Sequence, residues 1–393
     1  MKSFPAQGSI PLLSFLLWGG PVFAGGLSTP GQGARALSMA GAFTAVADDG
    51  SAVFYNPAGI SQIEGTLIEG GIAFVSPEIR YTTPGNATET STKDAFAPSL
   101  FITHRLTDRL SAGLGLYAPY ARDAEFPDDL ANGFPSQRSK MVRTDFNAVI
   151  SYQTSDTFSI GGGLAVGYSQ LDRSIPAGPG LRINDKMDGV GFGGIVGLLW
   201  KVSDHVKAGV TYRTEMLIDH DGERSFVAGG VATSSNARAE VRYPASLGFG
   251  MALTPSENLT LALDANWYGW SSMDQVTVRT DSWPDSTTPL NARDSRDIRI
   301  GGEYRLPTGW AVRAGYAYAQ GAFPNTHIIP AQPDADGDEI GLGIGKTTGT
   351  WRVDLAYHYA ATRETNASAN INGYNGKYNI SQHLLGMTAA HRF

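Results

Sequence analysis

Large apolar residues alternate with small or charged residues along most of the chain after residue 66. From Trp351 to Tyr359, every second side chain is a large apolar one, and Arg, Asp, Ala and His fill the positions between them. The segments 158–168 and 246–253 repeat the pattern with small residues in the intermediate positions. Because successive side chains of a strand point to opposite faces, the pattern predicts strands with one apolar and one small or charged face.

The connections between these segments alternate in length. Short turns are expected near 106–109, 153–157, 201–205, 254–258, 305–309 and 346–350. Polar loops are expected near 82–94, 122–139, 171–187, 221–237, 271–294, 321–337 and 363–377. The strands between these connections are roughly 11 to 18 residues long, which is enough to cross the outer membrane when they are tilted. The sequence therefore predicts an all-β transmembrane protein, a fourteen-stranded antiparallel barrel over 66–393.

The first 65 residues do not alternate. Residues 1–24 combine Lys2, an apolar core and a small-residue site ending at Ala24, which predicts a cleaved signal peptide and export. Residues 25–65 are rich in Gly and Ala. They centre on the motif Asn56, Pro57, Ala58 and Gly59. Because this segment directly precedes the strands, we expect it to lie inside the barrel as a hatch.

The composition supports a membrane sheet and excludes several classes of protein. Charged residues make up 17 % of the chain, below the roughly 25 % of soluble domains. The absence of Cys excludes disulfides and Cys-ligated metals, and the net charge of −7 does not suit nucleic acid. We expect a monomer in the Gram-negative outer membrane, surrounded by membrane lipid and lipopolysaccharide, with no nucleic-acid partner and no cofactor.

The segment from Gly33 to Gly59, GARALSMAGAFTAVADDGSAVFYNPAG, resembles the hatch of the FadL family of outer-membrane transporters. Segments 110–133, 241–253 and 297–321 are also similar to strands of that family. The resemblance implies a hatch-filled barrel that takes up hydrophobic molecules, long-chain fatty acids or aromatic hydrocarbons, without energy input. It also implies lateral release where the third strand is kinked.

The third predicted strand contains a proline that fits such a kink. The opening would lie at Ala118, Pro119 and Tyr120, because Pro119 cannot donate a ladder hydrogen bond and so marks a bulge or break. The alternative is that Pro119 only ends the strand at the external rim.

Inward positions supply the candidate ligand-binding residues. The apolar candidates are Phe43, Val53, Phe54, Ile60, Ile195 and Leu199. Alternation places charged residues inward as well, namely Arg143, Asp145, Lys207, Arg213, Asp264, Arg299, Glu303, Arg313, Arg352 and Asp354. Of these, Arg143, Arg299 and Arg313 are the candidates for binding a ligand carboxylate, which a guanidinium fits well. The alternative is that the arginines pair with inward acids and anchor the hatch.

No catalytic or metal site is predicted, and the chain is not expected to be an enzyme. Gly189, Gly191 and Gly194 match a dinucleotide motif, but they lie within a strand. The aspartates of 333–341 depart from a calcium loop, leaving at most a loosely held cation at the rim. Two alternative functions are a general porin for polar solutes and an outer-membrane lipid hydrolase. For the hydrolase, His358 with Asp354 is the nearest approach to a catalytic pair.

Overall fold

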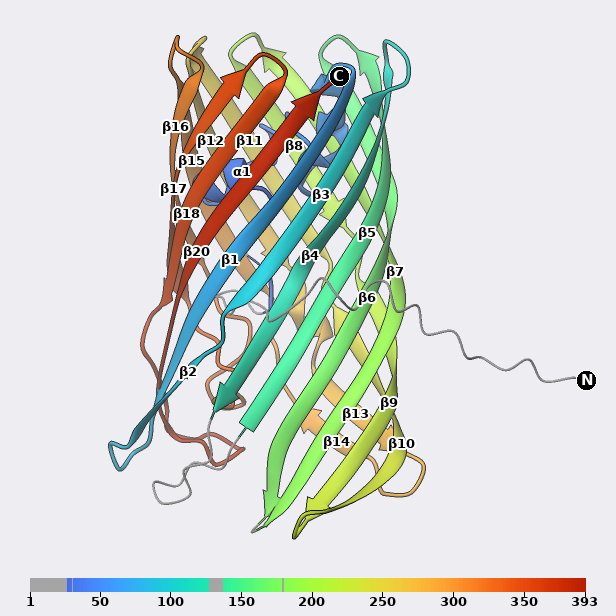
Figure 1. The fold of residues 1–393 in the computed structure, drawn as a ribbon, viewed down its shortest axis with the longest axis vertical. Coiled ribbons are helices and arrows are strands. Elements are labelled where there is room, and N and C mark those ends of the chain that lie inside the picture. Colours follow the sequence, from blue (N-terminus) through green and yellow to red (C-terminus); the bar gives the residue numbers. More distant parts are fainter. Residues whose placement is uncertain (1–26, 30, 127–136, 179) are drawn as a thin grey trace, which may run out of the picture.

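The structure is a computed structural model that describes residues 27–29, 31–126, 137–178 and 180–393. Its strands form one antiparallel sheet that closes on itself (Figure 1). The last strand, β20 (Gly376–Arg392), pairs with the first, β1 (Thr66–Thr82), from Leu67 opposite Arg392 to Thr82 opposite Lys377. The predicted signal peptide, residues 1–24, lies outside the described residues.

The wall of the described barrel has fourteen strand positions, as predicted. Besides β1 and β20, ten are single strands: β3 (Ala95–Arg105), β4 (Leu110–Phe126), β5 (Gln137–Ser155), β6 (Phe158–Gly178), β7 (Leu181–Ser203), β12 (Leu259–Tyr268), β15 (Ser295–Arg305), β16 (Trp310–Ala319), β17 (Gly337–Thr348) and β18 (Trp351–Thr362). Each of the other two positions consists of two consecutive strands that lie end to end. These are β8 (Val206–Arg213) with β9 (Met216–Ala228), and β10 (Val231–Tyr243) with β11 (Ser246–Ser256). Short strands β2 (Thr88–Thr92), β13 (Gln275–Thr280), β14 (Ser286–Pro289) and β19 (Thr365–Ala367) belong to the long connections.

The two faces of the wall are separated as the alternation predicts. On β6, Leu164 is 75 % exposed whereas its neighbour Ala165 is 3 % exposed. On β18, Trp351 and Leu355 are exposed whereas Asp354 is buried. Large apolar side chains therefore face outward, and small and charged ones face the lumen. Within the described residues, no helix is long and apolar enough to cross a membrane.

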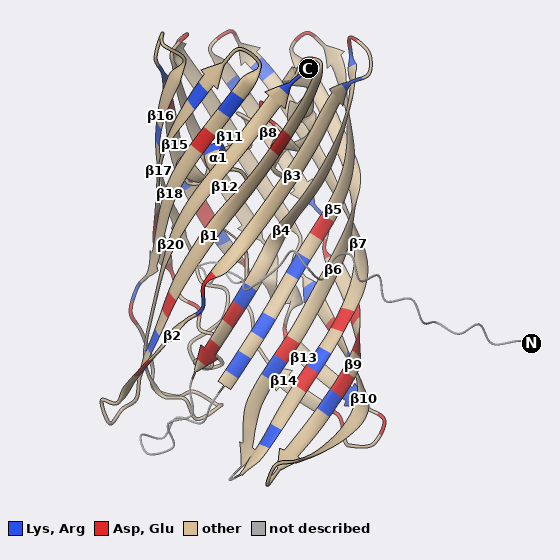
Figure 2. Cartoon of the chain, viewed as in Figure 1, with Lys and Arg blue, Asp and Glu red and all other residues tan. Residues whose placement is uncertain are grey.

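Two of the predicted loops are instead continuous strands. Loops were expected near 171–187 and 221–237, but β6 and β7 extend to Gly178 and Leu181, and β9 and β10 form a second long hairpin. Charged pairs across the strands stabilise these polar extensions. Asp185 pairs with Arg173 at 2.7 Å and with Arg224 at 2.6 Å. Figure 2 shows charged residues gathering on the strands towards this long-loop end. Polar composition alone was therefore a poor guide to where these strands end.

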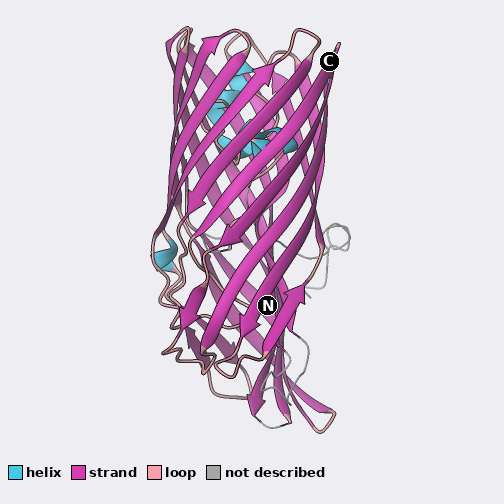
Figure 3. Cartoon of the chain, turned by 90° about the vertical axis from the view of Figure 1, so that its left-hand side faces the viewer, coloured by secondary structure: helices cyan, strands magenta, loops and turns pink. Residues whose placement is uncertain are grey.

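The helices that precede β1 in the described part of the chain lie inside the barrel, near the end with the short turns (Figure 3). They are α1 (Ala34–Ser38), α2 (Ala52–Tyr55) and the 3-10 helix η1 (Pro57–Gln62). Nearly every described side chain of this segment is buried. A second short 3-10 helix, η3 (Trp270–Ser272), follows β12 in the wall. The division of the chain at residue 65 into hatch and barrel stays a prediction.

Candidate functional site

The hatch motif joins two parts of the hatch to each other and to the wall. The Asn56 side chain accepts a hydrogen bond from the Ala58 N–H at 3.1 Å, and it donates to the carbonyls of Thr44 at 2.9 Å and of Leu198 on β7 at 3.0 Å. Pro57 occupies the first position of η1, where the missing N–H costs nothing. Asn56 and Pro57 thus form the start of η1, and the Asn56 side chain also joins η1 to β7 of the barrel wall.

Glycines of the wall let the hatch backbone come close. A Cβ atom added to Gly161 on β6 would lie 2.4 Å from the Ala58 nitrogen, and one added to Gly197 on β7 would lie 2.1 Å from Asn56 Oδ1. Across the barrel, a Cβ on Gly315 of β16 would lie 2.2 Å from the Met39 carbonyl carbon. No side chain fits at these three positions without moving the hatch. They therefore serve the hatch rather than a ligand.

Ion pairs fasten the hatch to the wall on the side of β15, β16 and β18. Arg35 of α1 pairs with Glu303 of β15 at 2.8 Å and with hatch residues Asp48 and Asp49. Burial alone would lower the pKa of Arg35, but the carboxylates of Asp48, Glu303 and Asp49 raise it. Arg35 is therefore charged and paired at any pH the protein meets.

The same network continues around the wall. Arg352 of β18 pairs with Glu69 of β1 at 2.7 Å, with Asp49 of the hatch at 3.3 Å and with Asp354 at 2.8 Å. Arg313 of β16 pairs with Glu303 at 2.6 Å and with Asp354 at 2.8 Å. Because the acids are all but inaccessible to solvent, these pairs bind the hatch and the wall into one buried unit.

The three arginines predicted to meet a ligand all have acid partners. Arg313 belongs to the network above. Arg143 pairs with Asp145 at 2.7 Å and lies 4.7 Å from the ring centres of both Tyr120 and Tyr243. Arg299 pairs with Asp297 at 2.7 Å and donates to the hatch carbonyl of Ala40 at 2.8 Å. Their inward orientation is confirmed, and their contact with a ligand stays a prediction.

A fourth inward arginine, Arg213 of β8, differs from these. Its guanidinium donates to the Phe54 carbonyl at 3.0 Å and to the Tyr117 hydroxyl at 3.3 Å, and it lies 5.0 Å from the centre of the Phe54 ring. No carboxylate of the described residues lies within ion-pair distance of it. Arg213 lines a luminal cavity of about 90 Å³ whose wall includes Tyr55 and Tyr268.

The strand register distinguishes Arg213 from the other inward arginines. Arg143 and Arg299 each stand two residues from an acid on the same strand face, and Arg313 faces Glu303 across the ladder. The ladder partners of Arg213 are Ile195 and Ser246, and neither carries a charge. The sequence alone does not show this difference, because Glu215 stands two residues from Arg213 and only the structure shows that β8 ends before it.

The apolar candidates are divided between packing and the cavity. Val53, Ile60 and Ile195 pack in one buried cluster with Phe101, and Phe43 belongs to a second cluster around Met39. Leu199 is buried opposite Gly209 of β8. Phe54 lies between the two clusters and also lines the cavity beside Arg213. Among the six candidates, Phe54 is therefore the one placed to touch a ligand in that cavity.

The third wall strand is bulged at the predicted position. Tyr117 of β4 lies opposite Asp145 of β5 and Tyr120 opposite Arg143, so the segment with Ala118 and Pro119 carries one extra residue. The strand continues beyond the bulge to Phe126, so the alternative that Pro119 ends the strand is wrong. In the described part of the chain, pairing between β3 and β4 stops at Leu116.

The start of the hatch occupies the edge of β4 that β3 leaves unpaired. We call residues 27–29 with 31–32 the N-terminal strap. Ser28 of the strap forms a bridge with Tyr120, and the Thr29 N–H donates to the Pro119 carbonyl at 2.9 Å. The Gln32 side chain donates to the Ala118 carbonyl at 2.9 Å. The strap therefore acts as a short added strand at the bulge.

Residues considered for other chemistry have structural partners. Asp334 accepts hydrogen bonds from the N–H groups of Ala322 and Phe323, and Asp336 accepts from Gly321 and Tyr318. No group of three His, Asp or Glu in the described residues is arranged to hold a metal. His358 is buried in the lumen, 3.3 Å from Glu339.

Known proteins resemble this chain over nearly its whole length. A long-chain fatty acid transport protein of Escherichia coli O6:H1 is 23 % identical over 389 residues, covering 86 % of this chain and 85 % of the relative. The crystal structure of a Pseudomonas aeruginosa FadL homologue superposes with a TM-score of 0.83 at 19 % identity, covering 94 % of this chain and all of the other. The Pseudomonas putida toluene transporter TodX superposes with a TM-score of 0.77 at 21 % identity, covering 95 % of this chain and all of the other.

At these identities the structural likeness establishes a common fold. The family model described as outer membrane protein transport protein (OMPP1/FadL/TodX) matches residues 16–393. This chain, a hatch-filled barrel with a bulged third strand, therefore belongs to that family of outer membrane transport proteins.

Proposed function

We propose that the chain carries hydrophobic compounds, long-chain fatty acids or aromatic hydrocarbons, across the outer membrane without energy input. The relatives named above transport a long-chain fatty acid in one case and toluene in another. The family is one of transporters, and the hydrolase alternative has no support in the site. An open porin for polar solutes is also disfavoured, because the hatch fills the lumen at the level of the short turns.

The observation that carries this proposal is the apolar lining of the other half of the lumen. A buried cluster of apolar side chains in the long-loop half of the lumen includes the rings of Tyr120, Tyr243, Trp270 and Phe323. We call it the upper luminal cluster, although the long-loop end is drawn at the bottom of Figure 1. The ring centre of Tyr120 lies 5.0 Å from that of Tyr243 and 5.9 Å from that of Trp270, and the ring centres of Trp270 and Phe323 are 5.8 Å apart. Leu27 of the strap packs in the same cluster. Polar solutes would lose hydration against these rings, whereas apolar molecules gain free energy by leaving water.

The contacts of the upper luminal cluster suggest the route. A ligand enters from the long-loop end, which faces the exterior, passes through the cluster and reaches the cavity beside Phe54. The strap then withdraws from Ala118, Pro119 and Tyr120, and the ligand leaves through the gap between β3 and β4. The strap is suited to this movement because no ion pair of its described residues holds it, only hydrogen bonds and the packing of Leu27.

Arg213 is the residue most suited to recognise a carboxylate in the cavity. A ligand carboxylate would meet a guanidinium that has no carboxylate of the described residues within ion-pair distance, and a charge-assisted hydrogen bond of this kind contributes roughly 1.5–3 kcal/mol. That free energy corresponds to roughly 10- to 150-fold in affinity. A neutral hydrocarbon would gain nothing from the same contact.

The test is a competition binding assay with oleate and p-xylene on the purified protein and on Arg213→Gln. Selective loss of oleate affinity by at least roughly tenfold makes the protein a fatty-acid channel. Preferential p-xylene binding that is indifferent to Arg213 makes it a hydrocarbon channel. The control is Arg80→Gln, whose exposed side chain pairs with Glu78 on β1. Binding of neither ligand by the unaltered protein would contradict the proposal.

A further inference from the structure

The barrel wall is interrupted a second time, between β8 and β9. Thr214 and Glu215 separate these strands, and at the same level Pro244 and Ala245 separate β10 from β11. Pro244 has no N–H to donate to a ladder. The wall therefore has two neighbouring strand breaks at one height.

The ladder between β7 and β8/β9 is irregular at this break. Ile195 lies opposite Arg213, whereas Gly191 lies opposite Ile218, so β8/β9 carries one more residue than β7 between the two pairs. The Gly194 N–H donates to the Thr214 hydroxyl at 2.9 Å, in a place where a regular ladder has a carbonyl. The Thr214 N–H also donates to the Gly194 carbonyl at 2.9 Å, so one side-chain and one backbone hydrogen bond close the wall here, and both must open for a ligand to pass.

On the luminal side, one methionine covers the break. Cβ atoms added to Gly167, Gly191 and Gly193 would lie 2.5 Å from Met216 Sδ, 3.2 Å from its Cγ and 3.0 Å from its Cε. The Met216 side chain thus fills the space that three inward side chains would otherwise occupy. Methionine is unbranched and adapts its shape at little cost. Met216 also belongs to the upper luminal cluster.

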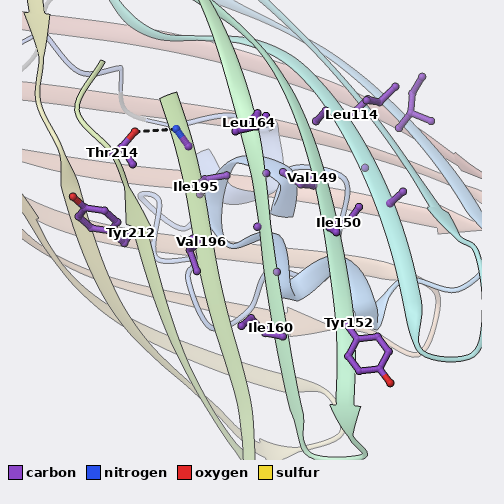
Figure 4. Close-up of a pocket in the computed structure, with 18 of the residues that line it drawn as sticks. Leu114, Val149, Ile150, Tyr152, Ile160, Leu164, Ile195, Val196, Tyr212 and Thr214 are labelled. Atoms are coloured by element: carbon purple, nitrogen blue, oxygen red, sulfur yellow. Dashed lines mark hydrogen bonds between the residues drawn. The ribbon is translucent and has the colours of Figure 1, made fainter. Parts of the chain in front are cut away.

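On the outer side, the break opens into a groove of about 1060 Å³ on the membrane-facing surface (Figure 4). Thr214 and Gly194 line its end, and Leu164 and Val196 stand beside them. The groove is apolar and continues across β6, β5 and β4, with Ile150 and Leu114 in its lining.

We propose that this break is a second lateral exit, through which an apolar ligand leaves the upper luminal cluster for the membrane-facing groove. The ligand displaces Met216 from Gly191 and Gly193, passes beside Thr214 and enters the groove, whose surroundings are the acyl chains of membrane lipid. The inference rests on the proposed transport function and adds an exit remote from the strap. A compound that is apolar along its whole length fits this exit, since Met216 and the groove are apolar and the charged groups beside Met216, Arg143 and Asp145, are paired with each other.

Disulfide locks test the exit, because the chain contains no Cys of its own. Gly194→Cys/Thr214→Cys closes the break, and Ser28→Cys/Tyr120→Cys fixes the strap on β4. The matched control is Leu198→Cys/Val210→Cys, a regularly paired position on the same strands outside the groove. Uptake of p-xylene by cells that lack other hydrocarbon channels is measured before and after reduction.

The proposal predicts partial loss of uptake with each lock relative to the same variant kept reduced, abolition with both, and a return to the level of the reduced variant when the disulfide is cleaved, which shows that the variants fold. The control lock leaves uptake unchanged. If the Gly194–Thr214 lock has no effect, alone or with the strap fixed, the second exit is wrong while transport stands. If the unaltered chain takes up neither p-xylene nor oleate, transport itself fails, and the exit with it.

A substitution without cross-linking gives an independent reading. With the strap fixed, Met216→Ala removes the cover and should raise the residual uptake of p-xylene. Met187→Ala, at an inward buried methionine that packs against Gly222, should not. Equal uptake in the two variants would contradict a passage at Met216.

Discussion

The hatch body, residues 33–62, and the N-terminal strap fill the same lumen but are held there by different forces. The hatch body is tied to the wall by buried ion pairs such as Arg35–Glu303 and by backbone contacts at glycines such as Gly315. The strap is held by hydrogen bonds to the edge of β4, by the buried side chain of Leu27 and by one hydrogen bond from the Gln32 N–H to the Tyr55 hydroxyl of the hatch body. Removing one partner of a buried ion pair costs ~3–5 kcal/mol, whereas one hydrogen bond contributes ~0.5–1.5 kcal/mol. The comparison indicates that the strap releases while the hatch body stays in place.

The largest effect is expected for Arg35→Met. The change leaves Glu303, Asp48 and Asp49 without their shared guanidinium, and we expect the free energy of unfolding to fall by ~3–5 kcal/mol. Urea unfolding in detergent micelles measures it. Arg80→Met removes an exposed ion pair on β1 and should change the free energy of unfolding by less than ~1 kcal/mol. Equal effects of the two changes would show that the network does not anchor the hatch body.

A smaller but clear effect is expected for Gly315→Val. Its side chain would occupy the position of the Met39 backbone, so the hatch body must shift, at a cost of at least ~1–3 kcal/mol. Limited proteolysis should cut the hatch body in this variant and not in the unaltered protein. Gly302→Val is the control, because an added Cβ there meets its nearest neighbour at an ordinary 3.4 Å. A protected hatch in Gly315→Val would contradict the close packing.

The smallest effect is expected for Gln32→Ala in the strap. Loss of its hydrogen bond to the Ala118 carbonyl should weaken the strap by ~0.5–1.5 kcal/mol and leave the unfolding of the barrel unchanged. Hydrogen exchange followed by mass spectrometry should show faster exchange at residues 27–32 alone. Gln275→Ala, at an exposed position of β13, should leave that exchange rate unchanged. Faster exchange across the hatch body as well would show that strap and hatch move together.

The sequence predicted the barrel well because its signal is local. Alternation at Trp351 to Tyr359 needs no partner strand to be recognised, and neither do the short turns. The prediction failed where pairing between distant segments decides the structure. Asp185 stabilises the polar extensions of the strands through its ion pairs with Arg173 and Arg224. The residues next to Asp185 in the sequence do not reveal these pairs.

In the candidate site, too, features with a local signal could be predicted, and features that depend on pairing between distant segments could not. The kink at Pro119 could be predicted because proline lacks an N–H at any position in a ladder. The strap could not, because its bridge between Ser28 and Tyr120 joins residues far apart in sequence. Likewise, Arg213 is distinguished by what its partner strands lack, and the register needed to see this appears only in the fold.

The central claim is that ligand passes when the strap moves and the hatch body does not. The most direct measurement compares oleate and p-xylene uptake by two reversible tethers, Ser28→Cys/Tyr120→Cys on the strap and Ser61→Cys/Ser159→Cys on the hatch body. The second pair replaces serines whose hydroxyls are 2.9 Å apart. Strap tethering should reduce uptake, leaving the part that the second exit carries, until the disulfide is reduced, and hatch-body tethering should leave uptake unchanged. Loss of uptake on tethering the hatch body, with uptake preserved when the strap is tethered, would contradict the account.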